Sequence, residues 1–287
     1  EITHPAGSLV ALMTQIALRL GIPDSSLARA VWRLDQAMGG GKSHGLIGLW
    51  HLATNTTTLA QTDLGQAVFA QAEAIAGKGR VASDLGRPVC VVLDCDNPEP
   101  RVEHDGPGQT LGERFLWRLF DGANRKWLEY KDHTASKAKL GEALTDVGRP
   151  VLILIDEIMD YLRWASNKDE TLALSDMAFL RALLDTVNDV PNCALVVVMI
   201  ASDKDRMVLN ELGQQCRSEL EDLLIRNGEA TTVSSGGDFA DIIRRRLFDN
   251  PPPVEVTSAT AQHFKEAMAG LWTNDVFGKL SGYDTGF

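Results

Sequence analysis

The sequence predicts an α/β fold, a three-layer sandwich with a mostly parallel five-stranded sheet and a small helical lid. Several short runs of aliphatic residues lack the polar alternation that a sheet with one solvated face would show. Strands of that kind are buried on both faces, as in a parallel sheet covered by helices. Segments with apolar residues at helical spacing fill the gaps between the runs, and alternating β and α units are typical of this architecture.

Five segments are expected to form the strands of the sheet. Four are strongly apolar and the fifth is weaker, and turn or polar residues bound each of them. In chain order they are AVWRLD at 30–35, PVCVVLD at 88–94, PVLILID at 150–156, CALVVVMIA at 193–201 and the weaker ATTVSS at 230–235.

The helices are expected between these strands. Their predicted ranges are 43–53, 111–120, 173–190 and 210–227. The third shows the clearest spacing of apolar residues, and Ser175 is a candidate cap within it. Three prolines at 251–253 mark a break in the chain, after which 258–272 is expected to form a further helix. We therefore predict an α/β core at 1–249 and the start of a helical lid or appendage at 250–287.

The charge of the chain restricts its partners. Its 28 basic and 39 acidic residues give a net charge of −11. Binding to nucleic-acid phosphates needs clustered lysine and arginine, so this balance argues against a nucleic-acid surface spread over the whole fold. The one dense basic patch in the sequence is Arg244–Arg246, and any DNA contact is expected there.

Other features predict a protein of the reducing cytoplasm that does not enter a membrane. The longest apolar run, ALVVVMIA at 194–201, is far shorter than the roughly 18 residues that a bilayer span needs. The start lacks the basic segment of a signal peptide. The four cysteines have no zinc-ligand spacing and are expected to be buried free thiols. The first residue is not Met, so we expect the chain to be a piece of a longer protein.

The stretch LDQAMGGGKSHGLIGL at 34–49 is the first candidate site. A phosphate-binding loop needs a strand that leads into it, glycines whose N–H groups point inward and a helix N-terminus beneath. The first expected strand, Gly39–Gly41 and a helix from Lys42 supply these parts. The G-x-x-x-x-G-K-[ST] pattern is met from Gly41 onward, whereas Gln36 stands where its first glycine belongs. The alternative is a glycine-rich turn that precedes a lysine.

On the phosphate-loop hypothesis this stretch binds ATP together with Mg²⁺. Lys42 would contact the β- and γ-phosphates, and the hydroxyl of Ser43 would bind the Mg²⁺ ion. The residues expected to surround the nucleotide are Met38, Gly39, Gly40, Gly41, Lys42, Ser43 and His44. His44 and His51 share one face of the following helix. Two ligands do not make a metal site, so we interpret this pair as packing or surface residues.

The stretch VLILIDEIMDYL at 151–162 is the second candidate site. A buried strand that ends in two adjacent carboxylates is costly unless these meet a cation or hydrogen-bond donors. Asp156 is expected to bind Mg²⁺, and Glu157 is expected to activate the attacking water. The alternative is a solvated strand end.

A third and weaker candidate is Ser202, at the end of the fourth expected strand. A polar residue at this point of the sheet would sense the γ-phosphate, and Asp203 is the alternative residue for that role. A strand-end serine without any such role is the competing interpretation.

Together these motifs resemble the AAA+ class of P-loop ATPases, in which Gly39–Ser43 corresponds to the end of the Walker A motif and Asp156-Glu157 to Walker B. More narrowly, MGGGKSHGLIGLWHLA, LILIDEIMDYLR and DIIRRRLF resemble a family of large prokaryotic AAA+-like ATPases that are often encoded beside DNA methyltransferases and anti-phage defence genes. The resemblance covers about residues 28–250. It implies a strand order of 5-1-4-3-2, a helical lid and assembly into a ring or dimer.

The resemblance also implies an arginine that a neighbouring subunit supplies to the γ-phosphate. Arg226 is the first candidate because it ends the helix before the fifth strand, and Arg217 lies on the same helix. Arg244, Arg245 and Arg246 suit a phosphate sensor within the chain or a DNA contact. Each of these arginines could instead be a solvated surface residue.

These observations predict an ATPase module that couples nucleotide state to the movement of partner subunits. It would act as a homo-oligomer or as the ATPase subunit of a larger complex, in DNA modification or phage defence. A switch that binds ATP with little turnover is the first alternative, and Glu157 argues against it. The second is a P-loop small-molecule kinase, for which no acceptor pocket can be read from the sequence.

Overall fold

The computed structural model describes residues 7–22, 28–35, 42–101, 105–122, 125–199 and 209–233, together with 256, 258–260 and 262–263. The chain divides into two compact units, Glu1–Val233 and Ser234–Phe287. The boundary that the sequence places between 249 and 250 lies outside the described residues and stays a prediction. Most of the helix expected at 258–272 lies outside them as well.

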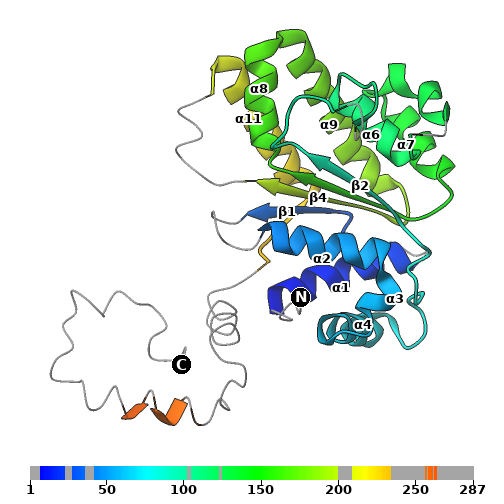
Figure 1. The fold of residues 1–287 in the computed structure, drawn as a ribbon, viewed down its shortest axis with the longest axis vertical. Coiled ribbons are helices and arrows are strands. Elements are labelled where there is room, and N and C mark those ends of the chain that lie inside the picture. The colour runs from blue at the N-terminus through cyan, green and yellow to red at the C-terminus, as the bar shows by residue number, and fades with distance from the viewer. Residues whose placement is uncertain are drawn as a thin grey trace. The chain divides into compact units, whose positions relative to one another are not determined.

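A five-stranded parallel sheet forms the centre of the first unit (Figure 1). Its strands are β1 (Val31–Asp35), β2 (Val89–Asp94), β3 (Val151–Asp156), β4 (Cys193–Met199) and β5 (Glu229–Thr231). They lie in the order β2-β3-β4-β1-β5, and each neighbouring pair runs parallel. The predicted α/β fold with a five-stranded parallel sheet is confirmed. Its strand order, read from the β5 edge, is 5-1-4-3-2.

Helices lie on both sides of this sheet (Figure 1). One layer holds α1 (Gly7–Gly21), α2 (Lys42–Thr54) and α4 (Asp63–Ala76), with the single turn α3 (Thr56–Leu59) between α2 and α4. The other layer holds α6 (Leu111–Leu119), α7 (Lys137–Asp146), α8 (Ile158–Lys168), α9 (Glu170–Asp189) and α11 (Glu211–Asn227), with the 3-10 turns η2 (Arg125–Glu129) and η3 (Lys131–His133). Among the described helices, none combines the length and the apolar character that a membrane crossing requires.

Alternate residues of each strand enter one of two hydrophobic cores. In β3, Val151, Ile153 and Ile155 pack with the layer of α6, α8 and α9, whereas Leu152 and Leu154 pack with the layer of α1 and α2. All five side chains are at most 2% exposed. Because successive residues of a strand point to opposite faces, a strand with helices on both faces needs an apolar residue at every position. This need explains the continuous aliphatic runs in the sequence.

The helices predicted at 43–53, 111–120, 173–190 and 210–227 are present as α2, α6, α9 and α11. The predicted start of one of these helices was wrong. Helix α9 begins at Glu170, and its N-cap is Asp169, whose side chain accepts the N–H groups of Thr171 and Leu172. Ser175, the expected cap, lies inside the helix. The last strand is also shorter than predicted, since β5 ends at Thr231.

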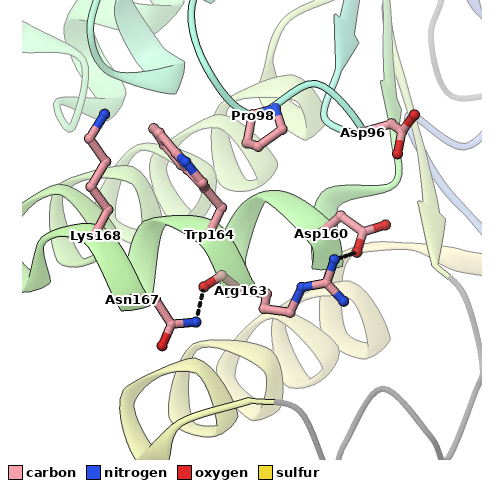
Figure 2. A pocket seen from close by; sticks show the side chains of 7 residues that line it. All are labelled: Asp96, Pro98, Asp160, Arg163, Trp164, Asn167 and Lys168. Atoms are coloured by element: carbon pink, nitrogen blue, oxygen red, sulfur yellow. Dashed lines mark hydrogen bonds and ion pairs between the residues drawn. The ribbon is translucent and has the colours of Figure 1, made fainter.

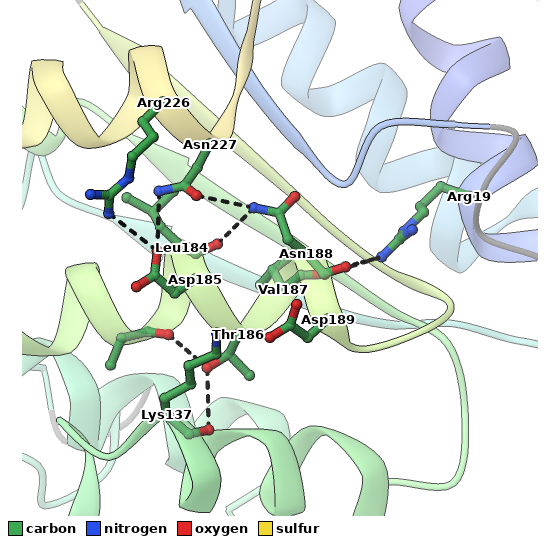
Figure 3. A network of polar contacts seen from close by, with 11 residues as sticks. Arg19, Lys137, Leu184, Asp185, Thr186, Val187, Asn188, Asp189, Arg226 and Asn227 are labelled. Carbon is green, nitrogen blue, oxygen red and sulfur yellow. Dashed lines mark hydrogen bonds and ion pairs between the residues drawn. The ribbon is translucent and has the colours of Figure 1, made fainter.

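Arg19 connects the first helix to the end of α9 and to the start of β4, and Figure 3 shows its contact at Val187. The side chain is 3% exposed, and it donates to the carbonyl oxygens of Cys193 at 2.9 Å, Val187 at 3.1 Å and Val190 at 2.9 Å. Two of these carbonyls belong to the end of α9 and the turn after it, where helix carbonyls have no partner within the helix. The buried arginine therefore fixes α1 against the beginning of β4.

The four cysteines are free thiols, of which Cys95, Cys193 and Cys216 are buried and Cys90 is partly buried. Burial raises the pKa of Cys90 and of Cys193 to about 12, so both stay protonated at neutral pH. The prediction of buried free thiols is confirmed for Cys95, Cys193 and Cys216, while Cys90 is free but only partly buried.

The parallel strands bring their carboxyl ends together along one side of the sheet, which we call the carboxyl edge. In open α/β sheets, ligands bind in the crevice outside this edge. Polar residues lie at this edge. Strand β2 ends at Asp94, β3 ends at Asp156, and Lys42 begins α2, the helix that follows β1 in the chain. The opposite side, where the strands begin, is called the amino edge.

Candidate functional site

Lys42 and Asp156 lie near one another at the carboxyl edge. Lys42 is the first residue of α2 and is 8% exposed, and Asp156 is the half-buried last residue of β3. Burial is the largest influence on Asp156 and raises its pKa, as do the charges of Asp94 and Asp96, while the Lys42 charge lowers it. The pKa of Asp156 is raised on balance. The fold thus brings the described ends of the two main candidate motifs into one place.

Glu157 turns the chain sharply from β3 into α8. Its backbone is left-handed, with φ 52° and ψ 39°, and it is the N-cap residue of α8. Its N–H group donates to the carboxylate of Asp156. A residue other than glycine costs of order 1–2 kcal/mol in this region, and such strain is concentrated at functional sites. The turn separates the two adjacent carboxylates, because Asp156 stays with the strand and Glu157 joins the helix.

Glu157 belongs to a cluster of carboxylates with Asp96 and Asp160, whose ligand atoms all lie within 4.8 Å of one another. We call these three residues the acidic cluster. Burial, followed by the charges of Asp156, Asp160 and Asp96, raises the pKa of Glu157. An ion pair of 2.5 Å from Arg163 to Asp160 offsets part of this repulsion (Figure 2). Oxygen ligands of this kind suit a hard divalent cation, and without one the mutual repulsion keeps the pKa of Glu157 raised.

Asp94, the last residue of β2, is paired with Asp156 in the register of the two strands. Its carboxylate accepts from Nδ2 of Asn97 at 3.0 Å and from Nη2 of Arg101 at 3.2 Å. Neither Asp94 nor Asp96 was expected at the site from the sequence. The sequence did carry a signal for these two residues. VLDCD at 92–96 is an aliphatic run that ends in carboxylates, as is LILIDE at 152–157.

An open groove of about 490 Å³ runs from the acidic cluster along the outer face of α8 (Figure 2). It is lined by Asp96, Pro98, Asp160, Arg163, Trp164, Asn167 and Lys168. At the end away from Asp96, Nζ of Lys168 lies 4.3 Å from the centroid of the Trp164 ring, a cation–π contact. The groove is therefore acidic at one end, where it adjoins the site, and cationic and aromatic at the other.

The other residues proposed to surround the nucleotide are exposed or lie outside the described part of the chain. Ser43 and His44 are exposed in the first turn of α2. His51 is partly exposed, and its Nδ1 lies 3.0 Å from Nδ2 of Asn55. Neither histidine belongs to a group of metal-ligating side chains among the described residues. The residues outside that part are Met38, Gly39, Gly40, Gly41, Ser202 and Arg244–Arg246.

Arg226 lies at the amino edge, on the far side of the sheet from the site. It is at the end of α11, just before β5, and its Nη2 is 3.4 Å from Oδ1 of Asp185 (Figure 3). Its side chain is 63% exposed. Within one chain Arg226 and Lys42 lie at opposite ends of the strands, so Arg226 does not adjoin the site of its own chain.

Arg217 occupies a different environment on the same helix. The residue is 7% exposed, and its Nε is 2.8 Å from Oε1 of Glu221, one turn further along α11. Burial and this ion pair make Arg217 part of the helix packing, which favours Arg226 over Arg217 as an arginine available to a neighbour.

The sequence as a whole matches one protein family over most of its length. A comparison with curated proteins gives no match. The family described as the DUF499 N-terminal domain matches residues 2–225, a range that includes β1 to β4 and every described residue of the site. The chain therefore belongs to the DUF499 N-terminal domain family.

Proposed function

We propose that the chain is an AAA+-type P-loop module that binds ATP with Mg²⁺ and hydrolyses it. The observation that carries the proposal is the meeting of Lys42, at the start of a helix, with Asp156, at the end of a neighbouring buried strand. A basic residue at a helix N-terminus beside an acidic strand end provides the parts of a phosphate and magnesium site. The strand order β2-β3-β4-β1-β5 also supports the P-loop assignment.

Lys42 would contact the β- and γ-phosphates. The N-terminus of α2 would add N–H groups that have no acceptor within the helix and the positive end of the helix dipole, both of which favour an anion. The 8% exposure of Lys42 strengthens this effect, because a charge interacts more strongly where water is excluded. The glycines before Lys42 would complete the cradle together with Met38 and His44.

Ser43 and Asp156 would hold the Mg²⁺ ion, which neutralises charge on the phosphates when it is bound. The raised pKa of Asp156 fits this role, because a cation would relieve the cost of its burial and the repulsion from Asp94 and Asp96. Glu157 would orient and deprotonate the attacking water. Its raised pKa brings it closer to neutral pH, where a general base is most effective.

The module would act with other subunits in the cytoplasm, in DNA modification or phage defence. The exposure of Arg226 and its place at the amino edge support a role for it at the γ-phosphate of a neighbouring chain. Ser202 would sense the γ-phosphate within the chain, and Arg244–Arg246 would contact DNA.

The test is equilibrium binding of ATP together with turnover, both measured with Mg²⁺ over a range of protein concentrations and with or without DNA. Binding with a turnover that rises with protein concentration supports the proposal. Binding without turnover at any concentration favours the switch. Transfer of phosphate to a small alcohol or acid in preference to water favours the kinase. Absence of ATP binding overturns the proposal.

A further inference from the structure

Arg114 is a buried arginine of α6 whose guanidinium makes two contacts with other segments. The residue is 3% exposed. Its Nη2 donates to the carbonyl oxygen of Pro98 at 2.6 Å, and its Cζ lies 5.5 Å from the centroid of the Tyr161 ring. The first contact is a charge-assisted hydrogen bond and the second is a cation–π contact.

These two contacts join the segments that supply the acidic cluster. Pro98 lies in the loop after β2, two residues beyond Asp96, and it lines the groove. Tyr161 lies in α8, directly after Asp160 and one turn beyond Glu157. Arg114 therefore connects the loop that carries Asp96 to α8, which carries Asp160 and begins directly after Glu157.

The far side of Tyr161 is held by a second buried side chain, Asp176 of α9. The Tyr161 hydroxyl donates to one carboxylate oxygen of Asp176, and the other oxygen accepts the N–H group of Leu111 at 2.8 Å. Tyr161 and Asp176 are both 0% exposed. Leu111 is the first residue of α6, the helix that carries Arg114. The contacts thus form a closed circuit through α6, α8 and α9.

Packing alone does not explain an arginine at this position. Nε of Arg114 has no hydrogen-bond partner among the described residues, which is unfavourable for a buried donor. Methionine would fill a similar volume without burying a charge. What the arginine adds is simultaneous contact with the Pro98 carbonyl and the Tyr161 ring, together with a positive charge that acts to lower the pKa of the buried Asp176.

We propose that Arg114 is a positioning residue that clamps the loop after β2 to α8, and so sets the spacing between Asp96 and the Glu157–Asp160 pair. This inference rests on the proposed function, because turnover of ATP is its main readout. Arg114 acts through Pro98 and Tyr161. Displacement of a reacting group by about 1 Å can lower a rate by about 10²-fold, so a clamp of this kind affects the chemical step more than binding.

The test compares Arg114→Met with a matched control on the same helix. Arg114→Met keeps the volume and the apolar stem and removes both polar contacts. The control is Arg118→Met, one turn further along α6, which removes an arginine whose Nη2 bonds to Asp105 at 2.8 Å. The quantities measured on the full chain are kcat, KM, equilibrium ATP affinity and amide hydrogen exchange in residues 95–98 and 158–161.

Arg114→Met is expected to lower kcat by about 10- to 100-fold, with ATP affinity within about 2-fold of the parent. Hydrogen exchange in 95–98 and 158–161 should become faster. Arg118→Met should keep kcat within about 3-fold of the parent. Arg114→Lys retains the charge and can reach the carbonyl but has no planar group to cover the ring, so it should recover part of the lost kcat.

The proposal is overturned if Arg114→Met and Arg118→Met have equal kcat and if amide hydrogen exchange in residues 95–98 and 158–161 is unchanged. Loss of ATP affinity in proportion to kcat also overturns it, since that result indicates a general disturbance of the site. If Arg114→Met does not fold, Arg114→Gln is measured in its place with the same outcomes. If the parent has no turnover, the proposed function fails. Faster exchange in the variant then still supports the clamp, and unchanged exchange overturns it.

Discussion

Asp94 and Asp156, the last residues of two adjacent parallel strands, lie side by side at the carboxyl edge of the sheet. Their surroundings differ. Asp94 is bonded to Asn97 and to the guanidinium of Arg101, whereas the pKa of Asp156 is raised by burial and by neighbouring carboxylates despite the charge of Lys42. The charge of Asp94 is thus balanced by Arg101 of the same chain, whereas the charge of Asp156 is only partly balanced by Lys42. Asp156 is therefore the carboxylate that gains more from a bound cation.

Lys42→Ala should remove ATP binding and leave the fold intact, because the lysine charge is held at the start of α2 beside Asp156. We expect the affinity to fall by at least about 10²-fold, the effect of losing two charge-assisted hydrogen bonds. Calorimetric titration with ATP and Mg²⁺ measures this. Lys78→Ala, at an exposed lysine beyond α4, should bind ATP like the parent. Undiminished affinity in Lys42→Ala would contradict the phosphate-loop hypothesis.

Glu157→Gln and Asp156→Asn should have different effects, because the left-handed turn at Glu157 sends the two side chains to different places. Glu157→Gln cannot accept a proton, so we expect it to keep ATP affinity and lose turnover by roughly 10²- to 10⁴-fold. Asp156→Asn should weaken Mg²⁺-dependent binding as well as turnover. Binding and turnover titrated against Mg²⁺ separate the two. Parental turnover in Glu157→Gln would remove Glu157 from the role of base.

Arg226→Ala should flatten the rise of specific activity with protein concentration and leave ATP affinity unchanged, because Arg226 is exposed at the amino edge. The control is Arg181→Ala, which also breaks an exposed ion pair between α9 and α11, with Glu219. The control should keep the concentration dependence of the parent. If activity per molecule is constant in the parent at all concentrations, the arginine comes from within the chain or from another protein.

Asp176→Asn should change the pH dependence of stability. Burial raises the pKa of Asp176 to about 6, against about 4 in an unfolded chain. Between these values the folded state binds more protons than the unfolded state, so the Asp176 contribution to stability falls as the pH rises from about 4 to 6. Asparagine cannot ionise and can still accept the N–H group of Leu111.

The free energy of unfolding of parent and Asp176→Asn should therefore diverge with pH. Measured by denaturant titration from pH 4 to 7, the difference should shift in favour of the variant by about 2–3 kcal/mol. A difference that is the same at every pH would mean that Asp176 titrates as an ordinary carboxyl group.

Glu157→Gly should raise stability while abolishing turnover. The left-handed backbone at φ 52° suits glycine, and the change also removes repulsion from Asp156 and the acidic cluster. We expect a gain of about 1 kcal/mol in the free energy of unfolding. Glu157→Ala serves as the control, because it removes the charge and keeps the strain. Equal stability in the two variants would show that repulsion, and not the backbone, is the main cost.

The sheet could be predicted from the sequence because its strands are buried on both faces and are therefore continuously aliphatic. Helix α8 was not predicted as an element. Its N-cap is a left-handed Glu157 whose side chain makes no capping hydrogen bond, so the usual start signal is missing. Helix α1, with buried residues around much of its circumference, likewise lacks the one-sided apolar pattern that marks a surface helix.

The sequence predicts only the part of the site that lies at the ends of recognisable elements. Asp156 and Glu157 end a recognisable strand, and Lys42 follows recognisable glycines. The approach of Asp96 to Glu157 depends on the path of the loop after β2, which a contact between Pro98 and Arg114 holds in place. No local pattern in the sequence encodes a contact between segments so far apart.

The position of β1 in the sheet has a consequence for how the protein is made. Strand β1 pairs with β4 and β5, which follow it late in the chain, and Arg19 also bonds to carbonyls near the start of β4. At roughly 5–20 residues per second, a ribosome completes β4 about 10–30 s after β1. Until β4 emerges, β1 lacks both of its neighbours in the sheet, and Arg19 lacks the carbonyl of Cys193. Strand β1 therefore reaches its native pairing only after β4 has left the ribosome, later than the pairing of β2 with β3.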